Sequence, residues 1–129
     1  MEFNYAFTRL HVSDYEACKA FYQEILGLNI TYEGDQYAEL DTGHTKITLL
    51  NQEKLNEIIG EPEVAAYAKG DDSIALTFRV HNLDEARREL EAKGVQFANE
   101  PWSFPELEYK STFFRDPDGN LIELEQPLA

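Results

Sequence analysis

The chain carries the same short sequence plan twice, and this repeat constrains its fold more than any other feature. Residues 10–16 (LHVSDYE) and residues 78–84 (FRVHNLD) each have the pattern of a strand end, a polar capping residue and the start of an amphipathic helix. Two copies of one structural unit are therefore expected in a single polypeptide.

Both predicted helices have start and stop signals. Ser13 with Glu16, and Asn82 with Glu85, have the spacing of a capping box. An apolar helical stripe and a glycine suited to position C′ follow in each copy: Tyr15, Cys18, Tyr22, Ile25, Leu26 and then Gly27 in the first, and Leu83, Ala86, Leu90 and then Gly94 in the second.

Extended segments follow each helix, so each half is predicted to be a βαβββ unit. They are residues 29–33, 37–40 and 45–50 in the first half and residues 96–99, 109–114 and 121–125 in the second. The expected fold class is α+β, one domain over residues 1–129, in which a helix covers one face of each mixed sheet and leaves the other face concave and open. Its parts are a first unit at 5–50, a connection at 51–73 and a second unit at 74–126.

The connection has its own signals. Gln52 to Ile59 is plausibly helical, Gly60 to Pro62 is a break, and Val64 to Lys69 is a short turn or helix.

The stretch 113–126 (FFRDPDGNLIELEQ) predicts a strand, a tight turn and a second strand. Asp116 to Gly119 has turn chemistry, because the proline presets φ, the aspartates cap backbone N–H groups and glycine tolerates positive φ. Alternation after the turn places Ile122 and Leu124 on the core face and Glu123 on the opposite face.

This hairpin, together with residues 21–28 (FYQEILGL), resembles the vicinal-oxygen-chelate superfamily of glyoxalase I, extradiol dioxygenases and bleomycin-resistance proteins, over residues 5 to 126. The resemblance implies the fold of that superfamily, a homodimer, and a small-molecule pocket on the concave sheets. In the metal-dependent members the last ligand is a Glu four residues after the turn glycine, and Glu123 stands there.

The other three ligand positions that the resemblance implies lack metal donors. Phe7 lies seven residues before the capping Asp14, Thr48 is the best match in the strand around residues 46–50, and Ala75 opens the strand of the second half. A divalent metal of this class needs several His, Gln or carboxylate ligands. One carboxylate is not a metal site, so no metal and no other cofactor is expected.

Alternation sends a mixed set of side chains to the concave face. Those chosen as candidate ligand-binding residues are Phe7, Arg9, His11, Thr48, Thr77, Arg79, Trp102, Phe113 and Glu123. Aromatic surface would hold the body of a ligand, and the scarce cations would orient an anionic group on it.

Several of these residues have a structural alternative. Arg9 and Arg79 either face the ligand or form surface ion pairs with the abundant acids. Glu123 is either a carboxylate paired to Arg9 or His11, or a ligand contact, or a proton-transfer group. His11 is either a hydrogen-bonded structural histidine or, with Glu123, a weak catalytic candidate.

Trp102 follows Pro101 in a segment similar to the Pro-Trp segment of bleomycin-resistance-type proteins, where the aromatic ring contributes to a drug pocket. The loop after it, Ser103 to Glu108, departs from that pattern. Packing at a subunit boundary is the alternative.

The composition restricts the kinds of binding partner and the cellular compartment that are expected for the chain. The chain of 129 residues has 25 acidic against 11 basic residues and a formal net charge of −14, which disfavours nucleic acid and anionic membranes as partners. Cys18 is the only cysteine and is expected in the core, so no intramolecular disulfide forms. Neither a signal sequence nor a long apolar run is visible, so a cytoplasmic protein is expected.

These observations favour metal-independent binding of a small organic molecule, of a kind that sequesters an antibiotic or a small organic acid. The alternative is a metal-dependent glyoxalase-like lyase or isomerase, or a dioxygenase, that uses Glu123. A third possibility is a dimeric module with a vestigial cavity.

Overall fold

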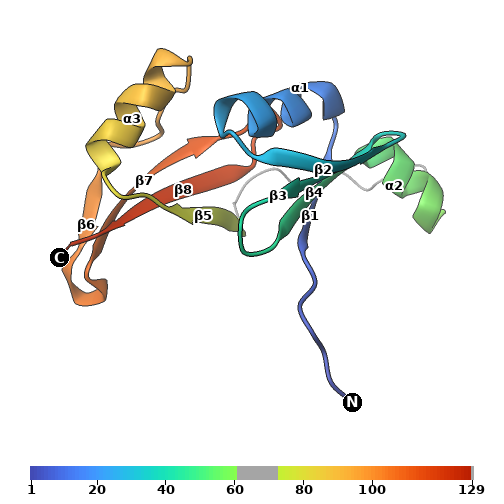
Figure 1. Ribbon diagram of the computed structural model, residues 1–129, viewed down its shortest axis with the longest axis horizontal. Coiled ribbons are helices and arrows are strands. Elements are labelled where there is room, and N and C mark those ends of the chain that lie inside the picture. The colour runs from blue at the N-terminus through green and yellow to red at the C-terminus, as the bar shows by residue number, and fades with distance from the viewer. Residues whose placement is uncertain (61–72, 129) are drawn as a thin grey trace. The chain divides into compact units, whose positions relative to one another are not determined.

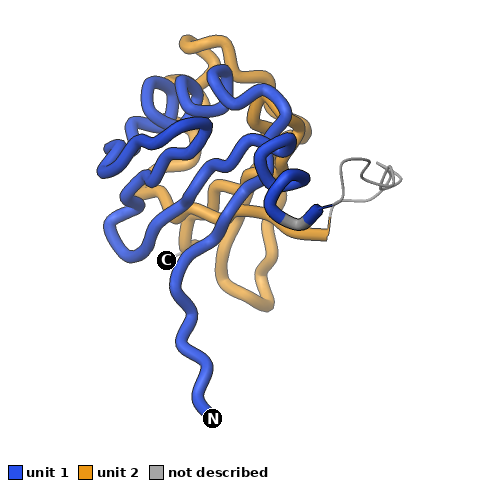
Figure 2. Tube along the Cα trace, turned by 90° about the vertical axis from the view of Figure 1, so that its right-hand side faces the viewer, with its two compact units in different colours: residues 1–67 blue, residues 68–129 orange. Residues whose placement is uncertain are grey.

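The computed structural model describes residues 1–60 and 73–128 of the chain. They belong to two compact units, residues 1–67 and residues 68–129 (Figure 2). The boundary between the units falls within residues 51–73, the segment predicted to connect the two halves. The turn or helix predicted at Val64 to Lys69 lies outside the described residues, as do the last two residues of the break predicted at Gly60 to Pro62.

Unit 1 is a four-stranded mixed sheet with α1 along one face (Figure 1). Its elements are β1 (Thr8–Val12), α1 (Tyr15–Ala20), a π-helical turn η1 (Phe21–Ile25), β2 (Asn29–Gly34), β3 (Tyr37–Asp41), β4 (Lys46–Asn51) and α2 (Gln52–Ile59). The strand order is β1-β4-β3-β2, in which β1 is parallel to β4 and the other neighbours are antiparallel. The predicted helix at Gln52 to Ile59 is confirmed, and Gly60 ends it with a φ of +78°.

Unit 2 repeats this plan. Its elements are β5 (Ala75–Arg79), α3 (Leu83–Ala92), β6 (Trp102–Phe104), a 3₁₀ turn η2 (Pro105–Leu107), β7 (Tyr109–Arg115) and β8 (Leu121–Pro127). The strand order is β5-β8-β7-β6, again with one parallel pair, β5 with β8. The predicted α+β fold of two βαβββ units is confirmed.

The strand register makes the two units comparable residue by residue. Arg9 lies opposite Thr48 in the parallel pair of unit 1, and Thr77 lies opposite Glu123 in the parallel pair of unit 2. Arg9 and Thr77 stand at the same distance before the N-cap residue of their helices. Thr48 and Glu123 are therefore equivalent positions, as are Arg9 and Thr77.

The helix ends follow the predicted chemistry with one correction. The N-cap of α1 is Asp14, the capping residue implied by the resemblance, and its side chain accepts the hydrogen bond from the backbone N–H of Ala17 at 3.1 Å. The capping box that Ser13 was predicted to begin is therefore wrong by one residue. The N-cap of α3 is Asn82 as predicted, and it accepts from the N–H of Glu85 at 3.0 Å.

Both helical segments end in the same way. Gly27 and Gly94 have φ values of +74° and +93°, a region in which glycine carries no Cβ penalty, so the predicted C′ positions are confirmed.

The second strand of unit 2 was predicted at the wrong place. Residues 96–99 form only an isolated bridge between Phe97 and Phe114, and β6 begins at Trp102 and extends into residues 103–108, which the sequence suggested were loop. The side chain of Asn99 accepts the hydrogen bond of the Phe113 N–H at 2.9 Å, so it takes the place of a ladder partner there. Pro101 has no N–H to offer the ladder. The edge of this sheet is interrupted for both reasons.

Each unit has its core between the helix and one sheet face. In unit 1 the buried residues include Val12, Cys18, Tyr22, Ala38, Leu40, Ile47 and Leu49, and in unit 2 they include Leu83, Leu90, Phe114, Ile122 and Leu124. Full burial of a large apolar side chain contributes about 1.5–3 kcal/mol. The predicted core position of Cys18 is confirmed, and the alternate side chains of the same strands are left for the opposite face.

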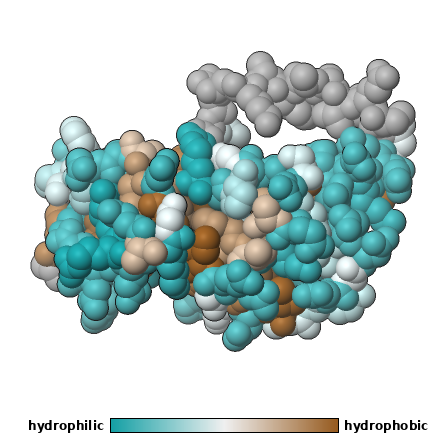
Figure 3. Space-filling model, turned by 90° about the horizontal axis from the view of Figure 1, so that it is seen from above, coloured by the Kyte–Doolittle hydropathy of each residue, from teal (hydrophilic) through white to brown (hydrophobic). Residues whose placement is uncertain are grey.

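The outside of the molecule is polar on the face shown in Figure 3, where hydrophilic residues predominate and hydrophobic ones occupy smaller areas. Within the described residues, every helix is too short or too polar to cross a lipid bilayer.

Candidate functional site

The turn before β8 fixes the position of Glu123. Asp116 is buried, and its Oδ1 accepts hydrogen bonds from the backbone N–H groups of Asp118 at 2.9 Å and Asn120 at 2.8 Å. Gly119 has a φ of +91°. Ile122 and Leu124 are buried on the α3 side, so Glu123 projects from the face opposite α3, as predicted.

Glu123 is held by a neighbouring strand of its own unit. Its Oε1 accepts a hydrogen bond of 2.8 Å from the hydroxyl of Thr77 on β5. Phe113 lies opposite Glu123 in the antiparallel pair of β7 and β8 and is half-buried. The structure thus brings the predicted residues Thr77, Glu123 and Phe113 into one row.

Arg79 has the surface ion pair that was one of its two predicted roles. It donates to Oε1 of Glu125 through Nε at 3.0 Å and through Nη2 at 2.8 Å. The Arg79 side chain is 71% exposed, so this pair adds little stability. Its charge is nevertheless matched locally by a carboxylate.

The next row of the same face contains a buried hydroxyl. Ser111 lies opposite both Glu125 and Trp102, and it is fully buried. Among the described residues its Oγ has no hydrogen-bond partner. Trp102 is 64% exposed at the start of the edge strand, so its ring is available to a ligand or to another protein surface.

The face of unit 2 opposite α3 is acidic. The pKa of the Tyr109 phenol is raised above its ordinary value. Desolvation is the largest cause, and the negative charges of Glu123 and Glu125 add to it. This face therefore combines aromatic surface with anionic oxygen atoms.

In unit 1 the equivalent position carries a cation. Arg9 on β1 donates from Nε to the hydroxyl of Thr48 on β4 at 3.2 Å, and Thr48 is fully buried. The guanidinium carbon lies 5.2 Å from the ring centroid of Phe7 and 5.5 Å from that of Tyr37. Both distances fall in the range of cation–π contacts. The structure thus joins the predicted residues Phe7, Arg9 and Thr48.

Tyr37 and Glu39 belong to this arrangement, although neither was predicted. The Tyr37 hydroxyl donates to Oε2 of Glu39 at 2.6 Å, and Lys46 Nζ donates to Oε1 at 3.0 Å. These bonds, led by that from Tyr37, hold the pKa of the Glu39 carboxyl below its usual range. Ala38 and Leu40 are buried on the other face, so alternation along β3 was the signal that points to Tyr37 and Glu39.

His11 lies two pairs further along the same strands, opposite Leu50, and is exposed. The pKa of His11 is lowered below its ordinary value. Partial burial of the ring is the larger cause, and the positive charge of Arg9 is the smaller one. His11 is thus a predominantly neutral imidazole beside a guanidinium at neutral pH.

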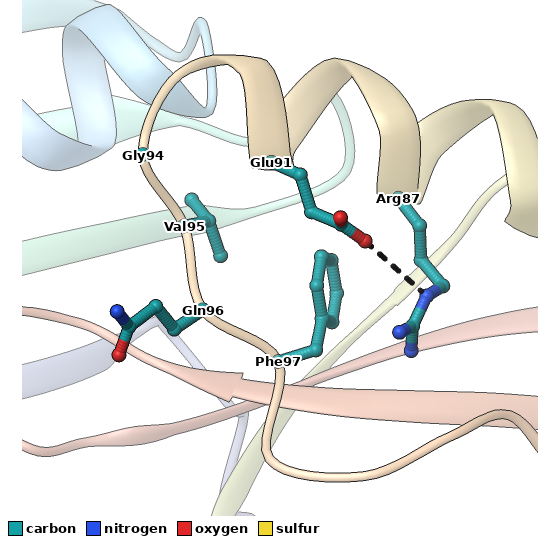
Figure 4. Close-up of a pocket in the computed structure, with 6 residues that line it drawn as sticks. All are labelled: Arg87, Glu91, Gly94, Val95, Gln96 and Phe97. Carbon is teal, nitrogen blue, oxygen red and sulfur yellow. Dashed lines mark ion pairs between the residues drawn. The ribbon is translucent and has the colours of Figure 1, made fainter.

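A shallow depression lies at the end of α3, lined by Arg87, Glu91, Gly94, Val95, Gln96 and Phe97 (Figure 4). Arg87 lies 3.7 Å from a carboxylate oxygen of Glu91, and its guanidinium carbon lies 4.4 Å from the centroid of Phe97. The same guanidinium donates to the carbonyl of Asn99 at 2.8 Å and to the hydroxyl of Thr112 at 2.6 Å. Its contacts attach the helix to the sheet, so this depression is explained by packing.

Comparison with known proteins agrees with this architecture. The model of the Glyoxalase/Bleomycin resistance protein/Dioxygenase superfamily matches residues 4–124. The chain belongs to this superfamily. A relative from Bacillus subtilis (strain 168), described as an uncharacterized protein YraH, is 37% identical over 122 residues, which cover 93% of this chain and 95% of the relative.

Solved structures of superfamily proteins share the fold. A glyoxalase/bleomycin resistance protein/dioxygenase from Nocardioides has a TM-score of 0.83 at 21% identity and covers 99% of this chain and 85% of that chain. Lactoylglutathione lyase from Agrobacterium tumefaciens has a TM-score of 0.72 at 20% identity, with 97% of this chain and 94% of that chain covered. At these identities the likeness concerns the fold alone.

The superfamily includes metal-dependent enzymes, but the donors described here do not fit such a metal. In unit 1, Phe7 offers no donor atom and the Thr48 hydroxyl accepts a hydrogen bond from a cation. In unit 2, Ala75 offers none, which leaves Glu123. Within residues 1–60 and 73–128, no group of three or more His, Cys, Asp or Glu side chains is placed to hold a metal ion.

Proposed function

We propose that this superfamily member binds a small organic molecule without a metal ion, on the sheet faces opposite α1 and α3. An antibiotic or a small organic acid is the proposed kind of ligand, and sequestration is the proposed role. On unit 1, the ring of Phe7 would contact the body of a ligand, and Arg9 and His11 would contact its polar groups. On unit 2, Trp102 and Phe113 would provide the aromatic surface, and Glu123 would contact a polar group. Such a mixture of apolar surface and few polar groups is usual for small-molecule sites.

The contact between Arg9 Nε and Thr48 Oγ1, at 3.2 Å, carries this proposal. Thr48 is equivalent to Glu123 by strand register, so it stands where the superfamily pattern places a metal ligand in unit 1. A guanidinium that donates to this oxygen repels a divalent cation and attracts an anion. The same position thus favours binding of an anionic or polar ligand over metal coordination.

Elemental analysis and a ligand screen test the proposal together. Protein purified without chelator is expected to hold no stoichiometric divalent metal. A thermal-shift screen of small carboxylates and aromatic drugs in excess EDTA is expected to return stabilising compounds. One metal ion per chain, together with an activity lost in Glu123→Gln, would overturn the proposal.

That result would favour the second candidate, a metal-dependent lyase, isomerase or dioxygenase. The observation on its side is Glu123, because no cation of the described residues lies within ion-pair distance of this carboxylate. Glu123 would then be a metal ligand or a base. Its hydrogen bond to Thr77 leaves Oε2 available for either role.

We also propose a cytoplasmic homodimer, as is usual for the superfamily. Exposed large apolar side chains at Trp102 and Leu107 support association of chains. Light scattering that gives the mass of one chain at micromolar concentration would contradict this part of the proposal.

A further inference from the structure

Arg9 differs from Lys46 and Arg79, because it has no carboxylate within ion-pair distance. Lys46 lies 3.0 Å from a carboxylate oxygen of Glu39, and Arg79 lies 2.8 Å from one of Glu125. No carboxylate among the described residues lies within ion-pair distance of Arg9. The Glu39 carboxylate interacts with the Arg9 charge from beyond that distance, and it is already hydrogen-bonded by Tyr37 and Lys46.

The guanidinium of Arg9 is also held in position. Nε is bonded to the fully buried Thr48, and the rings of Phe7 and Tyr37 lie within cation–π range of its carbon atom. Tyr37 is itself fixed by its hydrogen bond to Glu39. The Arg9 guanidinium is also hydrogen-bonded to the Tyr37 phenol. Its remaining terminal N–H donors are therefore held in advance, which lowers the entropic cost of binding a ligand.

We infer that Arg9 is a carboxylate-binding subsite of unit 1 and that the ligand class is an aromatic monocarboxylate. This inference rests on the proposed function, because it names the ligand of the same sheet face. The terminal nitrogens of the guanidinium match the spacing of the two carboxylate oxygens, and the bond to Nε leaves the end-on approach open.

The surroundings select the charge and shape of the ligand. The Glu39 carboxylate lies close by and the whole chain is acidic, so a second negative charge on the ligand is repelled. The phenyl ring of Phe7 and the phenol ring of Tyr37 provide surface for a flat apolar body. Phosphate esters and dicarboxylates are therefore disfavoured.

Benzoate and benzamide form a matched pair of probes, since they share shape and differ in charge. Each is titrated into the full-length chain, and binding is followed by NMR chemical-shift changes. The variants are Arg9→Gln, Arg9→Lys and, as a control for net charge, Arg88→Gln on the exposed side of α3. Spectral dispersion of each variant reports whether it is folded.

The wild-type chain is expected to bind benzoate at least about tenfold more tightly than benzamide. Arg9→Gln is expected to weaken benzoate binding by about tenfold to a hundredfold, and Arg88→Gln by less than about twofold. Arg9→Lys keeps the charge without the planar donor pair, so its binding should be intermediate. It also provides the comparison if Arg9→Gln does not fold.

Equal binding of benzoate and benzamide, or unchanged benzoate binding in the Arg9 variants, would overturn the inference. Failure of the wild type to bind benzoate would overturn it as well. In each case the metal content and the screen of uncharged and cationic drugs still decide the proposed function separately.

Discussion

Units 1 and 2 have the same strand order and register but opposite chemistry at equivalent positions. Arg9 and Thr48 of unit 1 pair a cation with a hydroxyl, whereas Thr77 and Glu123 of unit 2 pair a hydroxyl with a carboxylate. One row further, His11 lies opposite Leu50, while Arg79 is matched by Glu125. The backbone fixes where a side chain lies in this fold, and the sequence alone decides whether that place attracts an anion or a cation.

The largest expected effect is on the free energy of unfolding, and it comes from the side chains that attach each helix to its sheet. Arg87 on α3 and Lys19 on α1 occupy equivalent helix positions. The Arg87 side chain is only 14% exposed and donates to Asn99 and Thr112, whereas Lys19 pairs with exposed carboxylates of Glu16 and Glu33. Arg87→Ala should lower the free energy of unfolding by about 3 kcal/mol, because it removes two hydrogen bonds of a largely buried guanidinium, one of them to the fully buried Thr112.

Lys19→Ala should lower the free energy of unfolding by only about 0.5 kcal/mol. Chemical denaturation of the two variants measures the difference. Equal losses would mean that the two helix attachments are energetically alike in spite of their different contacts.

Removal of two hydroxyl groups on the sheet faces should change the stability of the protein in opposite directions. Thr48→Val deletes the acceptor of the Arg9 hydrogen bond and should destabilise the protein by about 1 kcal/mol. Ser111→Ala deletes a buried hydroxyl that has no partner among the described residues, and it should stabilise the protein by about 1 kcal/mol. Thermal unfolding of both variants tests this, and a destabilised Ser111→Ala would reveal a partner for that hydroxyl.

Arg79→Gln should change benzoate binding by less than about twofold, because Glu125 already matches the Arg79 charge. Titration of this variant beside Arg9→Gln compares the two units directly. A tenfold loss in Arg79→Gln would place the acidic end of the ligand on unit 2 instead.

The smallest expected effect is the dependence of the protein's stability on pH through His11. The pKa of His11 is lowered in the folded state, so the unfolded chain binds a proton more readily. The stabilising contribution is complete above the ordinary histidine pKa of about 6.5 and is lost as pH falls through the lower folded value. NMR titration of the His11 ring should give a pKa below 6.5 in the free protein, and a bound carboxylate should raise it. A His11 pKa above 6.5 without ligand would contradict this.

The fold could be predicted from the sequence because its signals are local and repeated. Asn82, Gly27 and Gly94 determine their helix ends through backbone hydrogen bonds and positive φ, which depend on residue type. The strand β6 was missed because a side chain, Asn99, replaces a ladder partner in the structure, and alternation patterns do not contain this information.

The candidate site was predicted less completely, for a different reason. Alternation predicted the correct sheet face for Arg9, Thr48 and Glu123. It did not predict which side chains they would contact. Whether a charged side chain faces a ligand or an ion pair depends on its neighbour across the strand, as Arg79 and Glu125 show. Alternation along β3 points to Tyr37 and Glu39, but the contact of Tyr37 with Arg9 depends on the strand order, which places β1 and β3 on either side of β4.

The sheet face of unit 1 is proposed to bind its ligand without a metal ion. Calorimetric titration of benzoate in excess EDTA, and again with one equivalent of Zn²⁺ and no chelator, tests it most directly. The same dissociation constant is expected in both titrations for the wild type and for Glu123→Gln. Binding that appears only with Zn²⁺ and disappears in Glu123→Gln would contradict it.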